Sequence, residues 1–451
     1  MTRKKLPIGI QTFREIREEN HYYVDKTPFA LRLIDEGKYY FLSRPRRFGK
    51  SLFLDTLAEL FAGNEPLFRG LYCHDKWDWT VKYPVIRISF GGGLARNSEA
   101  LDASIRFQLK IQAERLGLPV ADGSIPVQFA SLILAVEARS GQRAVVLVDE
   151  YDKPILDNLA RPDIAREMRD GLRDFYSVIK DADAHIRFAF LTGVSKFSKV
   201  NLFSGLNNLK DITVDGRYSA ICGYTDADVE SVFAQELDGL DRAQIRTWYN
   251  GYNWDGEAVY NPFDLLLLFD KRHFHAYWFE TGSPAFLIDM ITERRIFLPG
   301  IGRLEANEAL LSAFEIGDIS TEALLFQTGY LTIVNTERLD GGAYYTLAYP
   351  NREVREALTA CLLGRWLADE QKAVKQRIRL FRLLKANDFP GMEALFTAFF
   401  AGIPADWHRK NPIANYEGYY ASVFYAYFAA LGLDVVPEEA SYAGRLDMAV
   451  R

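Results

Sequence analysis

Cysteine and histidine are scarce in this chain. Only 3 of its 451 residues are cysteine and 6 are histidine. Cys73, Cys222 and Cys361 stand far apart and are odd in number, which fits unpaired thiols in a reducing cytoplasm and offers no metal-ligand spacing. His273 and His275 form the nearest histidine pair, but no cysteine or carboxylate stands at a useful spacing from them. We therefore expect a surface loop there rather than a metal site.

Long apolar runs are also lacking. The longest weakly polar stretch, residues 419–433, is only about fifteen residues long and rich in tyrosine, so a buried helix explains it better than a bilayer span. The N-terminus, Met1–Lys5, is basic, but no apolar segment of a secretory signal follows it. We expect a cytoplasmic protein with no membrane partner.

The chain has no large excess of acidic or of basic residues. The formal net charge is −6, so the protein is no polycation, and any contact with nucleic acid must come from a local patch. Hydrophobic residues make up 49% of the chain and aromatic residues 14%, which is enough for large packed cores and argues against global disorder. The length predicts two to four domains.

The most informative segment is a candidate phosphate-binding loop. An apolar stretch, Tyr39–Leu42, runs into a short basic loop, and Gly49, Lys50 and Ser51 then open an amphipathic helix that continues through Phe61. Backbone N–H groups at a helix N-terminus hold anions, and Gly49 lets the backbone come close to them. Lys50 would reach the β- and γ-phosphates of a nucleotide, and the Ser51 hydroxyl would bind Mg²⁺.

This loop departs from the usual pattern. The pattern G-x-x-x-x-G-K-[ST] has glycine where this chain has Arg44. The triplet at 49–51 also fits an ordinary helix start, but the strand before it and the helix after it favour nucleotide binding. We expect the nucleotide to contact seven residues of this segment: Arg46, Arg47, Phe48, Gly49, Lys50, Ser51 and Leu52.

A second segment supports the same interpretation. Residues 144–148 form a continuous apolar run that ends in Asp149 and Glu150. Such a run suits a strand buried on both faces of a parallel sheet, with ligand chemistry at its carboxyl end. Asp149 would hold Mg²⁺ through water, and Glu150 would polarise the attacking water. The acidic pair fits equally well as a cap for a helix at Tyr151–Leu159.

Strand and helix patterns alternate from residue 6 to about residue 215. This alternation predicts an α/β fold of the P-loop NTPase type, a parallel sheet with helices on both faces. We expect strands at Tyr39–Leu42, Val85–Phe90, Val145–Val148, Ile186–Leu191 and Ile212–Val214. We expect helices at Lys50–Phe61, Ser98–Leu116, Ile125–Ala138 and Arg166–Lys180.

The second half of the chain reads differently. From Thr225, where Asp228 completes a variant capping box, the pattern turns helical and predicts a small lid at 220–302. Two helices and a hairpin follow within 303–370, which is the layout of a winged helix. A helix at 372–385 carries six basic residues and no acidic ones. Its basic face would contact phosphate backbones or simply be solvated.

Four segments together resemble a known family. They are Tyr23–Thr27, Ser43–Ser51, Val148–Pro154 and Tyr260–Phe263, and the second is the most specific. Nearly the whole chain resembles the bacterial AAA-ATPase-like proteins that carry a C-terminal PD-(D/E)XK nuclease-like domain. The resemblance implies an ATPase core at 1–219, a helical lid at 220–302, a winged-helix-like segment at 303–370, and a connector with a partial α/β nuclease-like tail at 371–451.

The resemblance also implies roles for single residues. Lys50 and Ser51 match the phosphate and Mg²⁺ ligands, and Asp149 and Glu150 match the metal-side acid and the catalytic base. Thr192 stands where AAA-type ATPases sense the γ-phosphate, although a threonine that merely ends a strand fits as well. In this family the first P-loop glycine is commonly replaced. Asp25 and Lys26 match a motif upstream of the loop, to which we assign no role, whereas Lys196 and Arg217 are candidates for a completing positive charge.

The tail resembles only part of a nuclease. Glu417 on a predicted helix and Asp447 on a predicted strand match two of the acidic positions. The Glu-x-Lys strand that should follow is not found before Arg451, so we expect an incomplete nuclease site and an unpaired strand edge.

Three functions follow from these expectations. The first is a cytoplasmic Mg²⁺-dependent ATPase whose γ-phosphate charge is stabilised by Lys50, Mg²⁺ and Arg46 or Arg47. The second is a nucleotide-dependent switch or scaffold with little hydrolysis. The third is a nuclease that ATP licenses when the tail is complete. ATP and Mg²⁺ are the expected cofactors. The possible partners are a nucleic acid or a protein bound at the winged-helix-like and basic helical segments, or further copies of the same chain in a homo-oligomer.

Overall fold

The computed structural model describes residues 3–93, 95–196, 208–282, 285–294, 296–312, 314–340, 342–367, 369–401, 413–441 and 444–451. Within these residues the N-terminal half is built on a five-stranded sheet in the order β2-β3-β4-β1-β5, and every neighbouring pair is parallel. The strands are β1 (Tyr39–Ser43), β2 (Val85–Ser89), β3 (Ala144–Asp149), β4 (Ile186–Gly193) and β5 (Lys210–Asp211).

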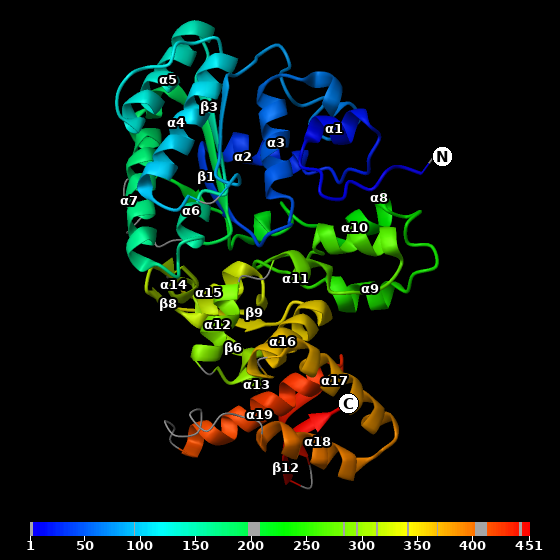
Figure 1. Ribbon diagram of the computed structural model, residues 1–451. Helices are drawn as coiled ribbons and strands as arrows, with labels where there is room; N and C mark the ends of the chain where they lie inside the picture. The colour runs from blue at the N-terminus through cyan, green and yellow to red at the C-terminus, as the bar shows by residue number, and fades with distance from the viewer. Residues whose placement is uncertain are drawn as a thin grey trace.

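Helices cover both faces of this sheet, as the strand–helix alternation predicts. Figure 1 shows α4, α5 and α7 on one side of the strands and α1 and α3 on the other. All residues of β3 are buried, which is why that strand reads as an unbroken apolar run. The helices are α1 (Phe13–Glu18), α2 (Thr27–Glu36), α3 (Lys50–Phe61), α4 (Ser98–Arg115), α5 (Ile125–Ser140), α6 (Lys153–Leu156) and α7 (Pro162–Asp181).

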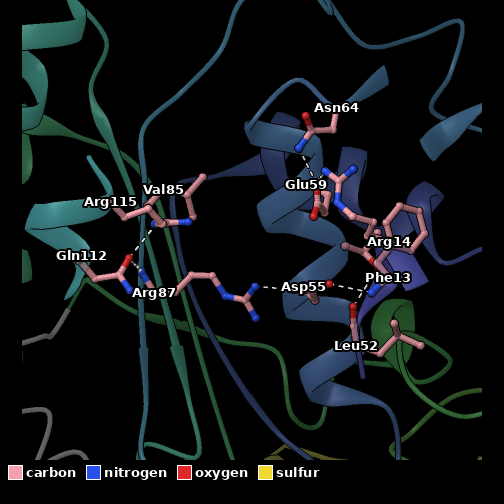
Figure 2. Close-up of polar contacts among 11 residues, drawn as sticks. Phe13, Arg14, Leu52, Asp55, Glu59, Asn64, Val85, Arg87, Gln112 and Arg115 are labelled. Atoms are coloured by element: carbon pink, nitrogen blue, oxygen red, sulfur yellow. Dashed lines mark hydrogen bonds and ion pairs between the residues drawn. The ribbon is translucent and has the colours of Figure 1, made fainter. Parts of the chain in front are cut away.

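A buried carboxylate fixes α3 against its neighbours. Asp55 of α3 accepts a hydrogen bond from the backbone N of Phe13 at 2.7 Å and forms an ion pair with Arg87 of β2. One turn further along α3, Glu59 pairs with Arg14 of α1 at 3.0 Å. Figure 2 shows these contacts reaching from the strand through α3 to α1. The helix that begins at the candidate phosphate loop is therefore held from both sides.

Residues 220–302 form the expected run of short helices, which we call the lid segment or lid, while its role as a lid stays a prediction. Its capping box is confirmed, because the Thr225 side chain and the Asp228 side chain each accept a hydrogen bond from the other residue's backbone N. Tyr22 and Val24 of the N-terminal segment lie in the lid's own hydrophobic core beside Phe233. The lid helices are α8 (Asp226–Val232), α9 (Arg242–Tyr249), α10 (Pro262–Lys271), α11 (Tyr277–Gly282), α12 (Ala285–Glu293) and α13 (Leu298–Ile301).

The next segment contains the expected helices and hairpin. The antiparallel sheet has the order β6-β10-β9, so a strand that we did not predict, β6, joins the hairpin. The winged-helix assignment itself stays a prediction. The elements are β6 (Leu304–Asn307), α14 (Glu308–Ser312), β7 (Phe314–Glu315), β8 (Asp318–Ile319), α15 (Thr321–Thr328), β9 (Thr332–Leu339), β10 (Gly342–Ala348) and α16 (Arg352–Leu367).

The tail consists of α17 (Glu370–Lys385), α18 (Phe389–Ala401), α19 (Ile413–Ala429) and an antiparallel hairpin of β11 (Val435–Ser441) and β12 (Gly444–Val450). Asp447 is exposed on β12, whereas the side chain of Glu417 on α19 lies outside the described residues. The nuclease-like assignment therefore remains a prediction.

The basic face of α17 is exposed, as expected for a solvated surface, but its apolar face is exposed as well. Val374, Ile378 and Phe381 keep 44%, 46% and 47% of their area open to solvent, and Ala373 and Leu380 are buried instead. In the described part of the chain, no helix combines the length and apolarity that a membrane span needs.

A buried pair of carboxyl groups joins the lid to α16. Asp264 of α10 and Glu353 of α16 are both buried, and burial followed by the Glu353 charge raises the pKa of Asp264 well above its ordinary 3.8. Glu353 also accepts a hydrogen bond from the backbone N of Trp278 at 2.8 Å. Protonation of one carboxyl group is what makes two such groups compatible in the interior.

Asp264→Asn should make the protein more stable at neutral pH. A raised carboxyl pKa means that the folded chain holds a proton that the unfolded chain releases above pH 3.8, so wild-type stability falls as pH rises through this window, at up to about 1.4 kcal/mol per pH unit. Asparagine keeps the shape and removes this titration. Urea unfolding from pH 4 to 8 measures the slope. Asp270→Asn, on the exposed face of the same helix, is the control, and identical slopes for wild type and Asp264→Asn would contradict the expectation.

Candidate functional site

The candidate phosphate loop joins β1 to α3. Gly49, with φ of 89°, is the residue before the helix, in the left-handed region that favours glycine. The Lys50 ammonium donates hydrogen bonds to the backbone oxygens of Arg44 at 2.8 Å and Pro45 at 2.9 Å. Burial lowers the pKa of Lys50, and the charge of Asp149 opposes this shift. An ammonium has three donors, so one N–H remains for a ligand.

Arg44, in place of the usual glycine, points into the protein. Its guanidinium is fully buried and donates to the backbone oxygens of Ser43 at 2.8 Å, Thr213 at 2.8 Å and Tyr218 at 3.0 Å. The same group lies 3.9 Å from the centre of the Trp254 ring. Burial lowers the pKa of Arg44 to about 10. The residue thus ties the start of the loop to the segment that follows β5 and to the lid.

Aromatic side chains from the lid support the rest of the loop. The Phe48 ring packs edge-on against Tyr252 at 4.7 Å and Trp254 at 5.5 Å between centroids. The indole N–H of Trp278 donates to the backbone oxygen of Arg46 at 3.1 Å. Sequence reasoning missed these supporting roles, although the density of aromatic residues between 248 and 263 was a signal that this segment packs against something large.

The acidic pair at the end of β3 is held by a residue of β4. The Thr192 hydroxyl donates to Asp149 Oδ1 at 2.6 Å, and the backbone N of Glu150 lies 3.0 Å from the same oxygen. Glu150 has φ of 52°, and burial followed by the Asp149 charge raises its carboxyl pKa. A Cβ on Gly91 would lie 3.3 Å from Glu150 Oε2, so the turn after β2 packs against this carboxylate.

The sheet brings the loop and the acidic pair together. β1 and β3 are both neighbours of β4, and Leu42 of β1 pairs with Thr192. The carboxyl ends of these parallel strands meet at one edge, and Asp149, Glu150 and Asp152 all act electrostatically on Lys50.

A cavity of about 520 Å³ opens at this edge of the sheet. This volume is within the range of small-molecule sites. Its walls include Arg46 to Phe53 of the loop and α3, Glu150, the N-terminal residues Tyr22 to Val24, and the lid residues Phe263 and Cys222. Burial raises the pKa of the Cys222 thiol.

The candidate positive charges fall into two groups. Lys26 lines the cavity and pairs with Asp228 at 2.9 Å. Lys196 and Arg217 do not line it. Lys196 pairs with Asp211 at 2.5 Å, and Arg217 pairs with Asp215 at 2.7 Å. Arg46 and Arg47 are exposed at the cavity, and the Arg47 guanidinium lies 4.8 Å from the Phe263 ring. The loop arginines are therefore better placed than Lys196 and Arg217 to meet an anionic ligand.

The residues expected to hold Mg²⁺ supply oxygen donors. Ser51 has a hydroxyl at the start of α3, and Asp149 has a buried carboxylate. Among the described residues, no group of three or more histidine, cysteine, aspartate or glutamate side chains could hold a metal ion alone. This sparse oxygen set fits Mg²⁺, which commonly takes its other ligands from phosphate and water.

Arg44→Gln should destabilise the protein. Glutamine removes the charge and the stacking on Trp254 and leaves buried carbonyl oxygens without a donor, at a cost on the order of 3 kcal/mol in the free energy of unfolding. Urea unfolding measures the change. Arg46→Gln is the matched control, because the side chain of Arg46 is exposed. Equal stability of the two variants would show that the buried guanidinium does not anchor the loop.

The chain is similar to known proteins over the region that contains this site. The model of the family described as "Predicted AAA-ATPase" matches residues 7–203, which include the loop, the acidic pair and Thr192. An uncharacterized protein in the vnfD 5′ region of Azotobacter chroococcum mcd 1 is 65% identical over 451 residues, covering 100% of this chain and 87% of the relative. The chain therefore belongs to the same family as this Azotobacter protein and carries an AAA-ATPase-like domain.

Proposed function

We propose that this protein binds Mg²⁺–ATP in the cavity between the sheet and the lid and hydrolyses the γ-phosphate. The observation that carries the proposal is that Lys50 at the start of α3 and Glu150 at the end of β3 line one cavity, while the charge of Asp149 acts on Lys50. The triphosphate would lie against the N-terminus of α3, where backbone N–H groups and the remaining Lys50 donor face it.

Each polar side chain at the site has a role in this proposal. Glu150 accepts the proton of the attacking water, and its raised pKa makes it a stronger base than an ordinary glutamate. Thr192 holds the Asp149 carboxylate in one orientation through its 2.6 Å hydrogen bond. Ser51 and Asp149 would hold Mg²⁺, which when bound neutralises charge on the phosphate oxygens. Arg46 and Arg47 add positive charge at the cavity mouth.

Thr192 therefore acts through Asp149 in this proposal. Its hydroxyl is committed to that carboxylate, so the residue orients a metal-side acid instead of reading the γ-phosphate directly. This role differs from the sensing role that the family resemblance implies. The two roles agree on the position of Thr192 at the tip of β4.

A slow nucleotide-dependent switch is the second candidate. The observation that favours it is the path from the loop to the C-terminal half, because Trp278 contacts the backbone of Arg46 with its indole and Glu353 of α16 with its backbone N. If bound nucleotide shifts the loop, the two hydrogen bonds of Trp278 would transmit that shift to α16. Turnover that is insensitive to Glu150→Gln, together with ATP-dependent assembly, would favour the switch over the enzyme. A nuclease that ATP licenses when the tail is complete stays a third hypothesis.

Lys50→Ala should abolish nucleotide binding. Alanine removes the phosphate-facing ammonium, and we expect the affinity for Mg²⁺–ATP to fall at least about 100-fold, on the scale of a lost charge-assisted contact. Isothermal titration calorimetry and nucleotide-dependent melting measure the loss. Lys110→Ala, on the exposed surface of α4, controls for the change in net charge. Equal affinity in wild type and Lys50→Ala would remove Lys50 from the site.

Glu150→Gln should separate binding from hydrolysis. The variant keeps the shape of the side chain but accepts no proton, so we expect ATP to bind as in wild type and kcat to fall about 100-fold or more. Wild-type turnover should also fall at acid pH, with a midpoint above the ordinary 4.5 of glutamate, because Glu150 must be ionised to act. This acid limb should be lost in the variant. Glu114→Gln on α4 is the control, and undiminished turnover in Glu150→Gln would reject the general base.

A further inference from the structure

A second cavity of about 570 Å³ lies in the C-terminal half of the protein. It shares no lining residue with the nucleotide cavity. Four parts of the chain meet there: Thr247 of α9 from the lid, the segment from Pro299 to Arg303, the residues from Ala348 to Arg355 between β10 and the start of α16, and Tyr425 of α19 with the first residues of β11 from the tail. A ligand in this cavity would touch the lid and the tail at once.

The charged residues that line this second cavity are all arginines: Arg303, Arg352 and Arg355. Two carboxylates partly balance them. Glu356 pairs with Arg352, and Asp434, 62% exposed, pairs with Arg355 at 3.5 Å. Arg303 forms no ion pair with any residue that the structure describes. The cavity therefore keeps an excess of guanidinium groups, which recognise phosphate in a planar, two-pronged geometry.

The Arg352 guanidinium is held in place before any ligand arrives. It lies 4.8 Å from the centre of the Trp248 ring, and together with Glu356 it packs so closely against Gly432 that a Cβ there would collide with both. Gly432 has φ of 78°, which also favours glycine. A fixed guanidinium loses little freedom on binding.

The turn before α16 adds further polar groups. Asn351 Oδ1 accepts a hydrogen bond from the backbone N of Val354 at 3.1 Å and so caps α16, and the Asn351 side chain also interacts with Tyr252. The Tyr349 hydroxyl is buried without a hydrogen-bond partner. Both residues line the cavity, and the N-terminal end of the 16-residue helix α16 adds its partial positive charge. This helix end and the three arginines together favour an anionic ligand.

We propose that this cavity binds a small phosphorylated organic molecule, with its phosphoryl group held by Arg303, Arg352 and Arg355. The volume is far larger than a bare phosphate requires, and Tyr349 and Tyr425 provide aromatic surface for the organic part. The bound molecule bridges lid and tail, so its occupancy stabilises their contact. This site is independent of the nucleotide site and of its chemistry.

The experiment uses the full chain carrying Lys50→Ala, which removes binding at the phosphate loop. Phenyl phosphate, inorganic phosphate and benzoate are titrated by calorimetry at constant ionic strength. We expect phenyl phosphate to bind more tightly than inorganic phosphate and at least about tenfold more tightly than the singly charged benzoate. In the same background, Arg303→Gln combined with Arg355→Gln should weaken phenyl phosphate binding at least about tenfold.

A variant that acts in the opposite direction separates binding from folding. Asp434→Asn releases Arg355 from its exposed carboxylate and should tighten phenyl phosphate binding several-fold, which a merely destabilised protein would not do. Binding that disappears with Lys50→Ala alone would overturn the proposal, because the phosphate would then sit at the first loop. Binding that ignores both the arginine and the Asp434 changes, or benzoate binding as tight as that of phenyl phosphate, would overturn it as well.

Discussion

The buried guanidinium of Arg44 is the contact on which the geometry of the site depends. It satisfies three backbone oxygens from three different places in the chain and stacks on Trp254 of the lid. Burying a cation costs free energy, and here three carbonyl oxygens and the Trp254 ring compensate the charge, while the Nε atom has no hydrogen-bond partner. The loop therefore leaves β1 at a fixed angle, and Lys50 can fold back onto the first two carbonyls of the loop. An arginine here replaces the flexibility of glycine with a cross-link to the lid.

The strands and helices around the phosphate-loop cavity were largely predictable from sequence. β1 and α3 begin and end within one residue of the expected positions, because an apolar run and an amphipathic period are local signals. The predicted position of β5 was wrong by two residues. The strand pairs at Lys210–Asp211, whereas we predicted it at the apolar residues 212–214 that follow. A short edge strand takes its register from its neighbour, and that neighbour is not visible in a local pattern.

Side-chain directions were the part that sequence could not supply. Nothing in the string of residues says that Arg44 points inward while Arg46 and Arg47 point outward. The contact between Thr192 and Asp149 joins residues 43 positions apart, and it exists because β3 and β4 are neighbours in the sheet. The exposure of the apolar face of α17 was equally unpredictable, since an amphipathic pattern normally indicates burial of that face. The direction and burial of such side chains depend on neighbours that are distant in the sequence.

The lid segment also supports the structure around the first cavity. Its aromatic residues support the loop, and the N-terminal segment enters its core through Tyr22 and Val24. Cys222 stands in the cavity wall with its thiol pKa raised by burial. A sulfur atom that keeps its proton is a poor nucleophile and resists peroxide. Oxidants should consequently leave this part of the cavity wall unchanged, because the Cys222 thiol reacts slowly with them.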